Sequence, residues 1–268
     1  MIQKYEQINF SKTILNRFIL FVVLFLVLIA PGAALAEIDE ATLNHAIDRA
    51  GLQRMLTQRM LKSYCQLGQD QFYIKPDEKL ADALIRYEEG LDFLKDFESV
   101  AGVKKSLTKI NSIWPKYKLL ITKKAIKDNV PELVQLNEKL LALSHRIVLD
   151  LQAKSGKELG KIVNISGRQR MLSQRIELFY LLRDWGFEDE YYLQALAKSR
   201  KEFTEGLAYL NNYPENTAEI KQLLAKAEKS FNLFSHSLDK KNNAFLISLT
   251  VGQLLKYMNT VTNLYSKM

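Results

Sequence analysis

The chain has 268 residues, of which 47% are hydrophobic and 25% are charged, and its net charge is +8. This composition excludes an intrinsically disordered protein, because the apolar content is high enough for a core. The lysines are spread along the chain, with no basic tract that contains interleaved aromatic residues, so we expect no nucleic-acid partner. Glycine and proline are scarce and helix-forming residues abundant, which predicts an all-α fold.

Residues 1–36 have the pattern of a targeting segment. Three basic residues precede the apolar run 18–30, and small residues follow the run up to Ala36. This order is typical of a secretory signal peptide. An N-terminal membrane anchor is the alternative, although the run is shorter than the roughly 20 residues of a spanning helix. The sequence therefore predicts that the rest of the chain is periplasmic, or anchored to the inner membrane facing the periplasm.

One motif occurs twice, with an offset of 116 residues. The segments AGLQRMLTQRML (50–61) and SGRQRMLSQRIE (166–177) are nearly identical, and EEGL at 88–91 is similar to TEGL at 204–207. This repeat predicts a duplicated unit, with a first copy at 37–152 and a second at 153–268. The recurrent glycine of the second motif indicates a close approach of two helices, although a tolerated glycine inherited at duplication explains it equally well.

Turn-forming residues divide each unit into four helices, which we expect to pack as antiparallel bundles. No proline lies between Pro131 and Gly186. The sequence therefore favours a long helix shared by the two units, with Gly156 and Gly160 as its weak points. A turn at these glycines would instead place the two motifs side by side.

The first motif helix is predicted to have two contact surfaces. At 100° per residue, Met55 and Leu56 lie on an apolar stripe, and Arg54 lies on the opposite side near Gln58. A buried arginine stays charged and needs acids, carbonyl groups or a bound anion around it. Arg54 and its counterpart Arg170 are therefore either exposed or lie in a contact between helices, where two guanidinium groups hold a small planar oxyanion.

A second pair of arginines falls within the apolar stripe. Arg59 and its counterpart Arg175 are expected to be buried there, each paired with a carboxylate from a neighbouring helix. The repeated acidic residues Glu89 and Glu205 are the candidate partners. Each pair would then stabilise the bundle and would have no direct role in ligand binding.

The two motif copies resemble the signature of PilJ-type sensor domains, the N-terminal modules of type IV pilus methyl-accepting chemotaxis transducers. That family is related to the four-helix sensor module of the NarX/NarQ nitrate-sensing kinases. The resemblance implies that Arg54 and Arg170 match the arginines that bind nitrate or nitrite, and that Gly51 and Gly167 permit close helix approach. It implies a structural role for Arg59, Arg175, Gln58 and Gln174.

Two departures limit what the resemblance implies. The nitrate sensors bind their ligand between two identical protomers, so a homo-dimer is one expectation, but this chain carries two unlike copies. Glutamine precedes each first arginine, as in the PilJ-like branch, so nitrate specificity does not follow. The sequence therefore leaves the identity of the anion open.

Two functions are compatible with these features. The first is an exported sensory module that binds a small anion or another small ligand. It lacks an output domain of its own and relays its state to a membrane-bound receptor or envelope protein. The alternative is a structural or adaptor bundle of the cell envelope without a ligand. An enzyme is not expected, because His45, His145 and His236 are scattered and no catalytic, metal-binding or cofactor motif is present.

The sulfur-containing residues are expected to belong to the core. Cys65 is the only cysteine, so an internal disulfide is impossible, and a small buried apolar residue is the expected role. Met55, Met60 and Met171 lie at helical spacing among leucines. They are therefore interpreted as core residues and not as ligands of a soft metal.

Overall fold

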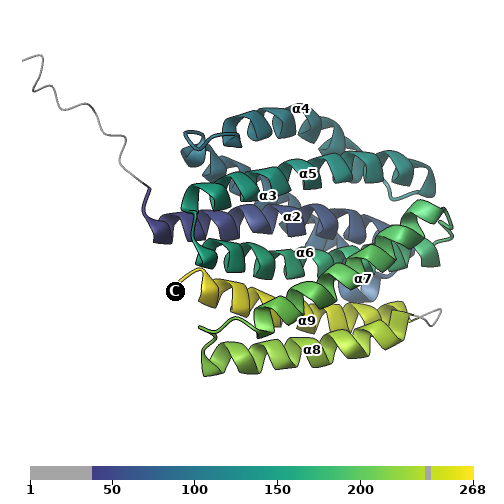
Figure 1. The fold of residues 1–268 in the computed structure, drawn as a ribbon. Helices are drawn as coiled ribbons and strands as arrows, with labels where there is room; N and C mark the ends of the chain where they lie inside the picture. The colour runs from purple at the N-terminus through teal and green to yellow at the C-terminus, as the bar shows by residue number, and fades with distance from the viewer. Residues whose placement is uncertain (1–37, 239–242) are drawn as a thin grey trace, which may run out of the picture. The chain divides into compact units, whose positions relative to one another are not determined.

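The computed structural model describes residues 38–238 and 243–268 (Figure 1). In this part of the chain the regular elements are α-helices and three short 3₁₀-helices, so the predicted all-α class is confirmed. The predicted targeting segment 1–36 lies outside the described residues. Within those residues, no helix combines the length and the apolar character needed to cross a membrane.

The helices follow one another in two sets of four. The first set is α2 (Glu40–Gly68), α3 (Pro76–Leu94), α4 (Val103–Ile121) and α5 (Val130–Ser155). The second set is α6 (Glu158–Asp184), α7 (Glu190–Asn211), α8 (Ala218–Leu238) and α9 (Ala244–Tyr265). The 3₁₀-helices are Phe72–Ile74, Lys95–Phe97 and Lys127–Asn129. Residues Asp39–Met268 form one compact unit, and the domain boundaries 37–152 and 153–268 stay a prediction.

The prediction of one continuous helix shared by the two halves is wrong. Helix α5 ends at Ser155, Gly156 has a φ of 63°, and α6 begins at Glu158. The amide of Gly156 donates to the carbonyl of Gln152 at 3.0 Å and closes the last turn of α5. Glycine adopts this left-handed conformation without steric cost, so it ends a helix readily. The alternative, a turn that brings the two motifs together, is the observed arrangement.

The two motif helices α2 and α6 form the central pair of the fold (Figure 1). They run in parallel, because a later residue of one helix bonds to a later residue of the other. Lys62 donates a hydrogen bond to Gln174 at 2.7 Å, and Gln69, directly after α2, donates one to the carbonyl of Leu181 at 3.2 Å. Helices α3 and α5 flank α2, while α7 and α9 flank α6. The two remaining helices lie further out, where α4 packs on α5 and α8 packs on α9. Both motif helices are therefore covered on more than one side, in agreement with the two predicted contact surfaces.

The glycines of the second motif lie where helices approach closely. A Cβ atom placed on Gly90 would lie 1.7 Å from Nε2 of Gln53. The equivalent atom on Gly206 would lie 2.0 Å from Nε2 of Gln169. Both glutamines are buried. The close-approach interpretation of these glycines is confirmed in both halves.

The sulfur-containing residues lie in the core, as predicted. Cys65 is free and fully buried, and this desolvation raises the pKa of its thiol. Met55, Met60 and Met171 are buried as well. A buried thiol that is held protonated is a poor nucleophile, so Cys65 acts here as an apolar packing residue.

A buried polar network fixes the register of α2 against α6. The ammonium of Lys62 donates to a carboxylate oxygen of Glu177 at 2.9 Å and to the side chain of Gln174 at 2.7 Å. The second carboxylate oxygen of Glu177 accepts from Gln66 at 3.0 Å and from Ser248 of α9 at 2.6 Å. A shift of one helix along the other would leave these groups buried without partners, which is costly.

Candidate functional site

The motif helices are in close contact at the first glycine of each motif. A Cβ atom on Gly51 would lie 3.9 Å from the Cα atom of Gly167. The same atom would lie 3.3 Å from Nη2 of Arg54 and 3.4 Å from Nη2 of Arg170. The two glycines therefore leave the space in which both guanidinium groups lie, and the helices approach closely there, as the family resemblance implied. A role of these glycines in ligand binding stays a prediction.

Arg54 and Arg170 are buried in this contact, with exposed fractions of 1% and 4%. The interpretation that they are surface residues is wrong, and the interpretation as residues of a helix–helix contact is confirmed. Side chains on a helix point toward its N-terminus, so each arginine reaches back and across to the other motif helix. Arg54 contacts Asn164 of α6, and Arg170 contacts Asp48 of α2.

The two arginines differ in how their charge is balanced. Nη2 of Arg170 donates to the carboxylate of Asp48 at 2.6 Å and to its backbone carbonyl at 3.2 Å. Arg54 donates to the side-chain oxygen of Asn164 at 2.8 Å and to its carbonyl at 3.2 Å. Asp48 and Asn164 are equivalent positions of the repeat, separated by the same offset as the motifs. One arginine is therefore neutralised by a carboxylate, whereas the other meets a neutral amide.

The environment of Arg54 opposes its positive charge. Burial, and then the nearby charges of Arg168 and Arg170, lower the pKa of Arg54 to about 9. The guanidinium still carries its charge at neutral pH. Its Nε atom, like that of Arg170, is buried and has no hydrogen-bond partner within the described residues, so the two arginines differ in the charge of their partners and not in this atom. A small anion beside Arg54 would supply both the missing charge and an acceptor.

His145 of α5 completes the surroundings of Arg54. Its Nδ1 atom lies 3.1 Å from Nη1 of Arg54. Because arginine can only donate, this nitrogen must accept, and the ring is neutral with its proton on Nε2. Burial, followed by the charges of Arg54 and Arg168, lowers the pKa of His145 to about 4. The sequence interpretation, which treated this histidine as one of three scattered residues, missed this contact.

The lowered pKa of His145 predicts a pH dependence of stability. Between the ordinary histidine value of about 6.5 and about 4, the unfolded chain binds a proton that the folded chain does not. The free energy of unfolding is therefore expected to fall as the pH is lowered through this window, by about 1–2 kcal/mol because the ring is partly exposed. Chemical denaturation between pH 4 and pH 7 measures this change.

The control for this pH dependence is His145→Gln, which still offers an acceptor to Arg54 but has no proton to bind. The variant should lose that part of the pH dependence, while His236→Gln, a change of the same kind on α8, should keep it. Equal pH slopes for the wild type and His145→Gln would contradict the assignment of a neutral ring with a lowered pKa.

The Arg54 site opens into a groove between α5, α6 and α7. The groove consists of two hollows of about 330 and 370 Å³ that share five lining residues. The first is lined by Arg54, Glu138, Leu141, Ala142, His145, Arg168, Met171 and Lys198. The second adds Arg175, Tyr191, Gln194, Ala195, Ser199 and Glu202.

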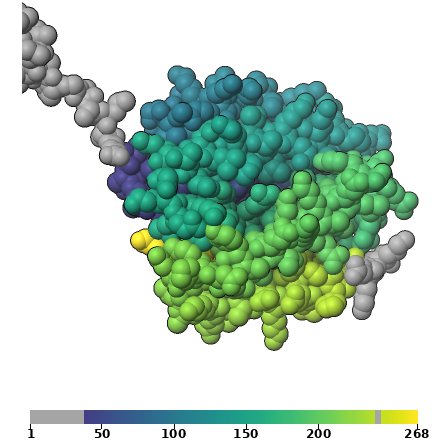
Figure 2. Space-filling view, in the orientation of Figure 1, coloured from purple at the N-terminus to yellow at the C-terminus, as the bar shows by residue number. Residues whose placement is uncertain are grey.

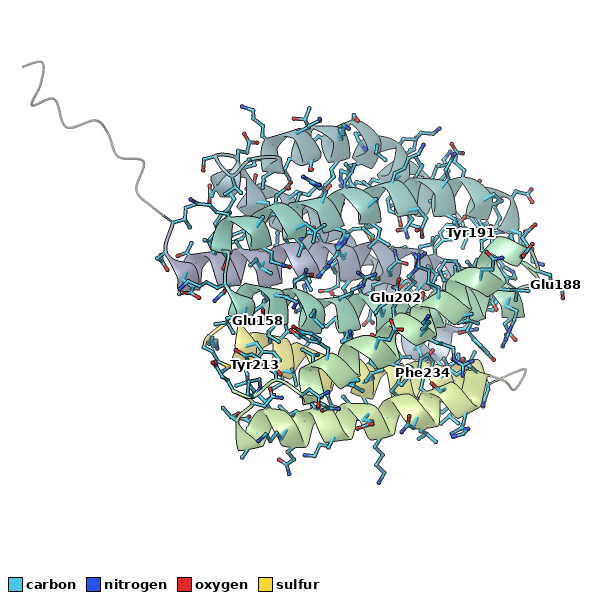
Figure 3. All side chains as sticks on the ribbon, viewed as in Figure 1. Glu158, Glu188, Tyr191, Glu202, Tyr213 and Phe234 are labelled. Atoms are coloured by element: carbon cyan, nitrogen blue, oxygen red, sulfur yellow. The ribbon has the colours of Figure 1, made fainter. Side chains whose placement is uncertain are left out.

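This groove lies on the face of the molecule shown in Figure 2, with α5 in teal on one side and α7 in green on the other. Figure 3 shows two lining residues of α7, with Tyr191 near the start of the helix and Glu202 further along it. No cluster of His, Cys, Asp or Glu suited to a metal ion occurs in the described part of the chain. The groove is lined by four cationic side chains, Arg54, Arg168, Arg175 and Lys198, and by two carboxylates, Glu138 and Glu202.

The second arginines, Arg59 and Arg175, are half-buried and not fully buried as predicted, and their partners differ from the predicted ones. Nη2 of Arg59 lies 3.5 Å from the carboxylate of Asp82, and Glu89 is exposed. The predicted pairing with Glu89 is wrong because α3 runs antiparallel to α2. Gly90 meets α2 at Gln53, so the part of α3 that lies beside Arg59 is about two turns earlier.

Arg175 is likewise not paired with Glu205, which is exposed and lies near Lys201. Its guanidinium forms a bidentate ion pair with Glu138 of α5, in which the Nη2–Oε2 distance is 3.1 Å. Arg175 also donates to Oε1 of Gln58 at 3.1 Å. The prediction failed because it considered only acidic residues that recur in both halves. Glu138 does not recur, since its equivalent position in α9, at an offset of 114 residues, is Gly252.

The motif glutamines Gln58 and Gln174 both link the central helices. Gln58 accepts from Arg175 of α6, and Gln174 accepts from Lys62 of α2. Both glutamines are buried. These contacts are of the structural kind that the sequence predicted for them, and they join the two copies to each other.

Together, the fold and the site define an all-helical protein with a paired arginine motif at its centre. Residues 151–240 match the family model PilJ, described as the type IV pili methyl-accepting chemotaxis transducer N-terminal region. The predicted resemblance to PilJ-type sensor domains is confirmed for this segment, which contains the second motif. The likeness of the first half to the family, and of either half to the nitrate-sensing kinases, stays a prediction.

Comparison with curated proteins and with solved structures gave no match. The family match covers α6 and α7 and runs to the end of α8. It therefore supports a sensory, signal-transducing helical module and leaves the ligand and the partner open.

Proposed function

We propose that this chain is an exported sensory module that binds a small anion at Arg54 and relays its state to a membrane-bound receptor or envelope protein. The family match supports the sensory role, since PilJ domains are the N-terminal regions of chemotaxis transducers. Export rests on the composition of residues 1–36. Nitrate and nitrite are the first anions to test, because a planar oxyanion fits the fork of a guanidinium.

The observation that carries this proposal is the difference between two equivalent positions. Asp48 supplies Arg170 with a carboxylate, but Asn164 gives Arg54 only neutral acceptors. Buried charges are normally paired, so Arg54 is the group that a bound anion would complete. The proposal therefore predicts one anion for each chain, held at Arg54 and not at Arg170.

A homo-dimer is not needed to build this site. Arg54, Asn164, His145 and the groove all belong to one chain. In the nitrate sensors that the motif resembles, the ligand lies between helices of two protomers. Here the corresponding pair of helices, α2 and α6, belongs to one chain. The purified protein is therefore expected to bind its ligand as a monomer, which the molar mass of the anion-bound protein in solution, measured by light scattering, tests.

The test is the substitution Asn164→Asp, which gives Arg54 the same carboxylate partner that Arg170 has. The side chain keeps its shape, and Gln152, now an acceptor from Asn164 at 2.6 Å, can rotate its amide to donate instead. Isothermal titration with nitrate, nitrite and acetate should show a loss of affinity of at least about tenfold. The melting temperature in the absence of anion should rise.

The control is Asn111→Asp, which adds the same charge on the exposed surface of α4 and should leave binding unchanged. Wild-type affinity in Asn164→Asp would refute the site. If the wild-type protein bound no anion at all, the chain would be better described as a structural or adaptor bundle in which Arg54 serves packing alone.

A further inference from the structure

The groove beside Arg54 is larger than an inorganic oxyanion requires. The hollow that contains Arg54 has a volume of about 330 Å³ and continues into one of about 370 Å³. A water molecule takes up about 30 Å³ in the liquid, and nitrate has only four atoms. A nitrate ion on Arg54 would leave most of this space to solvent. Pockets of this size are typical of sites for small organic ligands.

The charges of the groove leave two cations without a carboxylate. Both lining carboxylates are engaged, because Glu138 pairs with Arg175, and Glu202 pairs with Arg168 at 2.8 Å. Arg54 has only neutral partners, and Lys198 of α7 is exposed with no carboxylate partner in the described residues. One of these two cations is therefore buried at the floor of the hollow, and the other is at its rim.

The wall of the same hollow includes an apolar strip. Leu141 and Ala142 of α5 and Met171 of α6 line it together with Arg54 and Lys198. A short hydrocarbon chain would pack against these three residues and would find no hydrogen-bonding group on them. The hollow thus combines a buried guanidinium, an apolar strip and an exposed ammonium.

We propose that the ligand of this groove is a short-chain dicarboxylate, with one carboxylate on Arg54, its methylene groups against Met171 and its second carboxylate on Lys198. This inference rests on the proposed function, because it names the class of anion that the Arg54 site takes. A carboxylate is planar, so it presents to Arg54 the same forked geometry as nitrate. The second carboxylate distinguishes this ligand from any inorganic oxyanion.

The experiment compares malonate, succinate and glutarate with acetate, propionate and nitrate by isothermal titration on the purified protein. At least one dicarboxylate should bind about fivefold or more tightly than the monocarboxylates. The variant Lys198→Gln should remove that advantage, and it should weaken acetate and nitrate far less than it weakens the dicarboxylates, because only the dicarboxylates place a carboxylate on Lys198. Lys226→Gln on α8 removes an equally exposed positive charge outside the groove and should change nothing.

The outcomes separate this inference from the function on which it rests. If nitrate or acetate bound and Asn164→Asp abolished that binding, but no dicarboxylate bound more tightly, the dicarboxylate assignment would be wrong and the anion site would stand. If Lys198→Gln left the preference for dicarboxylates intact, the proposed placement of the second carboxylate would be overturned. If no anion bound, the anion site would fail together with this inference.

Discussion

Replacing Lys62 with leucine is expected to lower the free energy of unfolding by about 3–5 kcal/mol, because it leaves the carboxylate of Glu177 buried without its cation. Glu177 has no exposed surface, and its remaining partners, Gln66 and Ser248, are neutral. Chemical denaturation of the wild type and the variant at neutral pH measures the difference. A loss below about 1 kcal/mol would show that solvent reaches this network.

The repeat itself supplies the matched control for this prediction. The position equivalent to Lys62 is Leu178, and the position equivalent to Glu177 is Leu61. The double variant Lys62→Leu/Glu177→Leu therefore places at each position the residue that the other copy already has. Because it removes both charges together, it should recover most of the stability that Lys62→Leu loses. A double variant no more stable than the single one would contradict the ion-pair explanation.

The substitution Asp48→Asn is expected to create a second anion site. It gives Arg170 the neutral partner that Arg54 has, so two buried guanidinium groups would then lack a carboxylate. Without ligand, the free energy of unfolding should fall by about 1–3 kcal/mol. With a saturating anion, most of this loss should be recovered, because the ligand binds only the folded state.

Isothermal titration of Asp48→Asn should show two anions per chain, against the one that the proposed function predicts for the wild type. The combined variant Asp48→Asn/Asn164→Asp is the control, because it exchanges the two partners and should return the stoichiometry to one, now at Arg170. A stoichiometry of one in the single variant would show that the surroundings of Arg170 exclude a ligand for a reason other than Asp48.

Much of the fold follows from local patterns that the sequence displays directly. The helices, the buried motif and the close approaches at Gly51 and Gly90 were predictable, because helical periodicity and recurring glycines report on local geometry and packing. The turn at Gly156 was the alternative to the continuous helix that the sequence favoured. A glycine at that point is compatible both with a continuous helix and with a turn, and only the contact between α2 and α6 decides between them.

The site was predictable in part. The repeat identified Arg54 and Arg170, since a charged residue that recurs in a core motif needs a reason to be buried. The partners of these arginines lie on other helices, and the register between helices is not a local property of the sequence. Asp48 and Asn164 could have been found by comparing the two copies position by position, because these equivalent residues differ in charge and each lies close to the repeated motif. His145 gave a weaker signal, because its equivalent at the offset of 114 is Asn259, in a pair of segments that resemble each other less than the motifs do.

The parallel pairing of α2 and α6 within one chain has a consequence for how a signal would depend on ligand concentration. Two identical protomers must carry the same residue at both positions, whereas covalently joined halves can change separately, as Asp48 and Asn164 have done. Under the proposed function, a pair with one open side would saturate along a simple hyperbola, since a single anion site per chain gives nothing to steepen the curve. Such a module would report ligand concentration gradually over a broad range, with no sharp threshold.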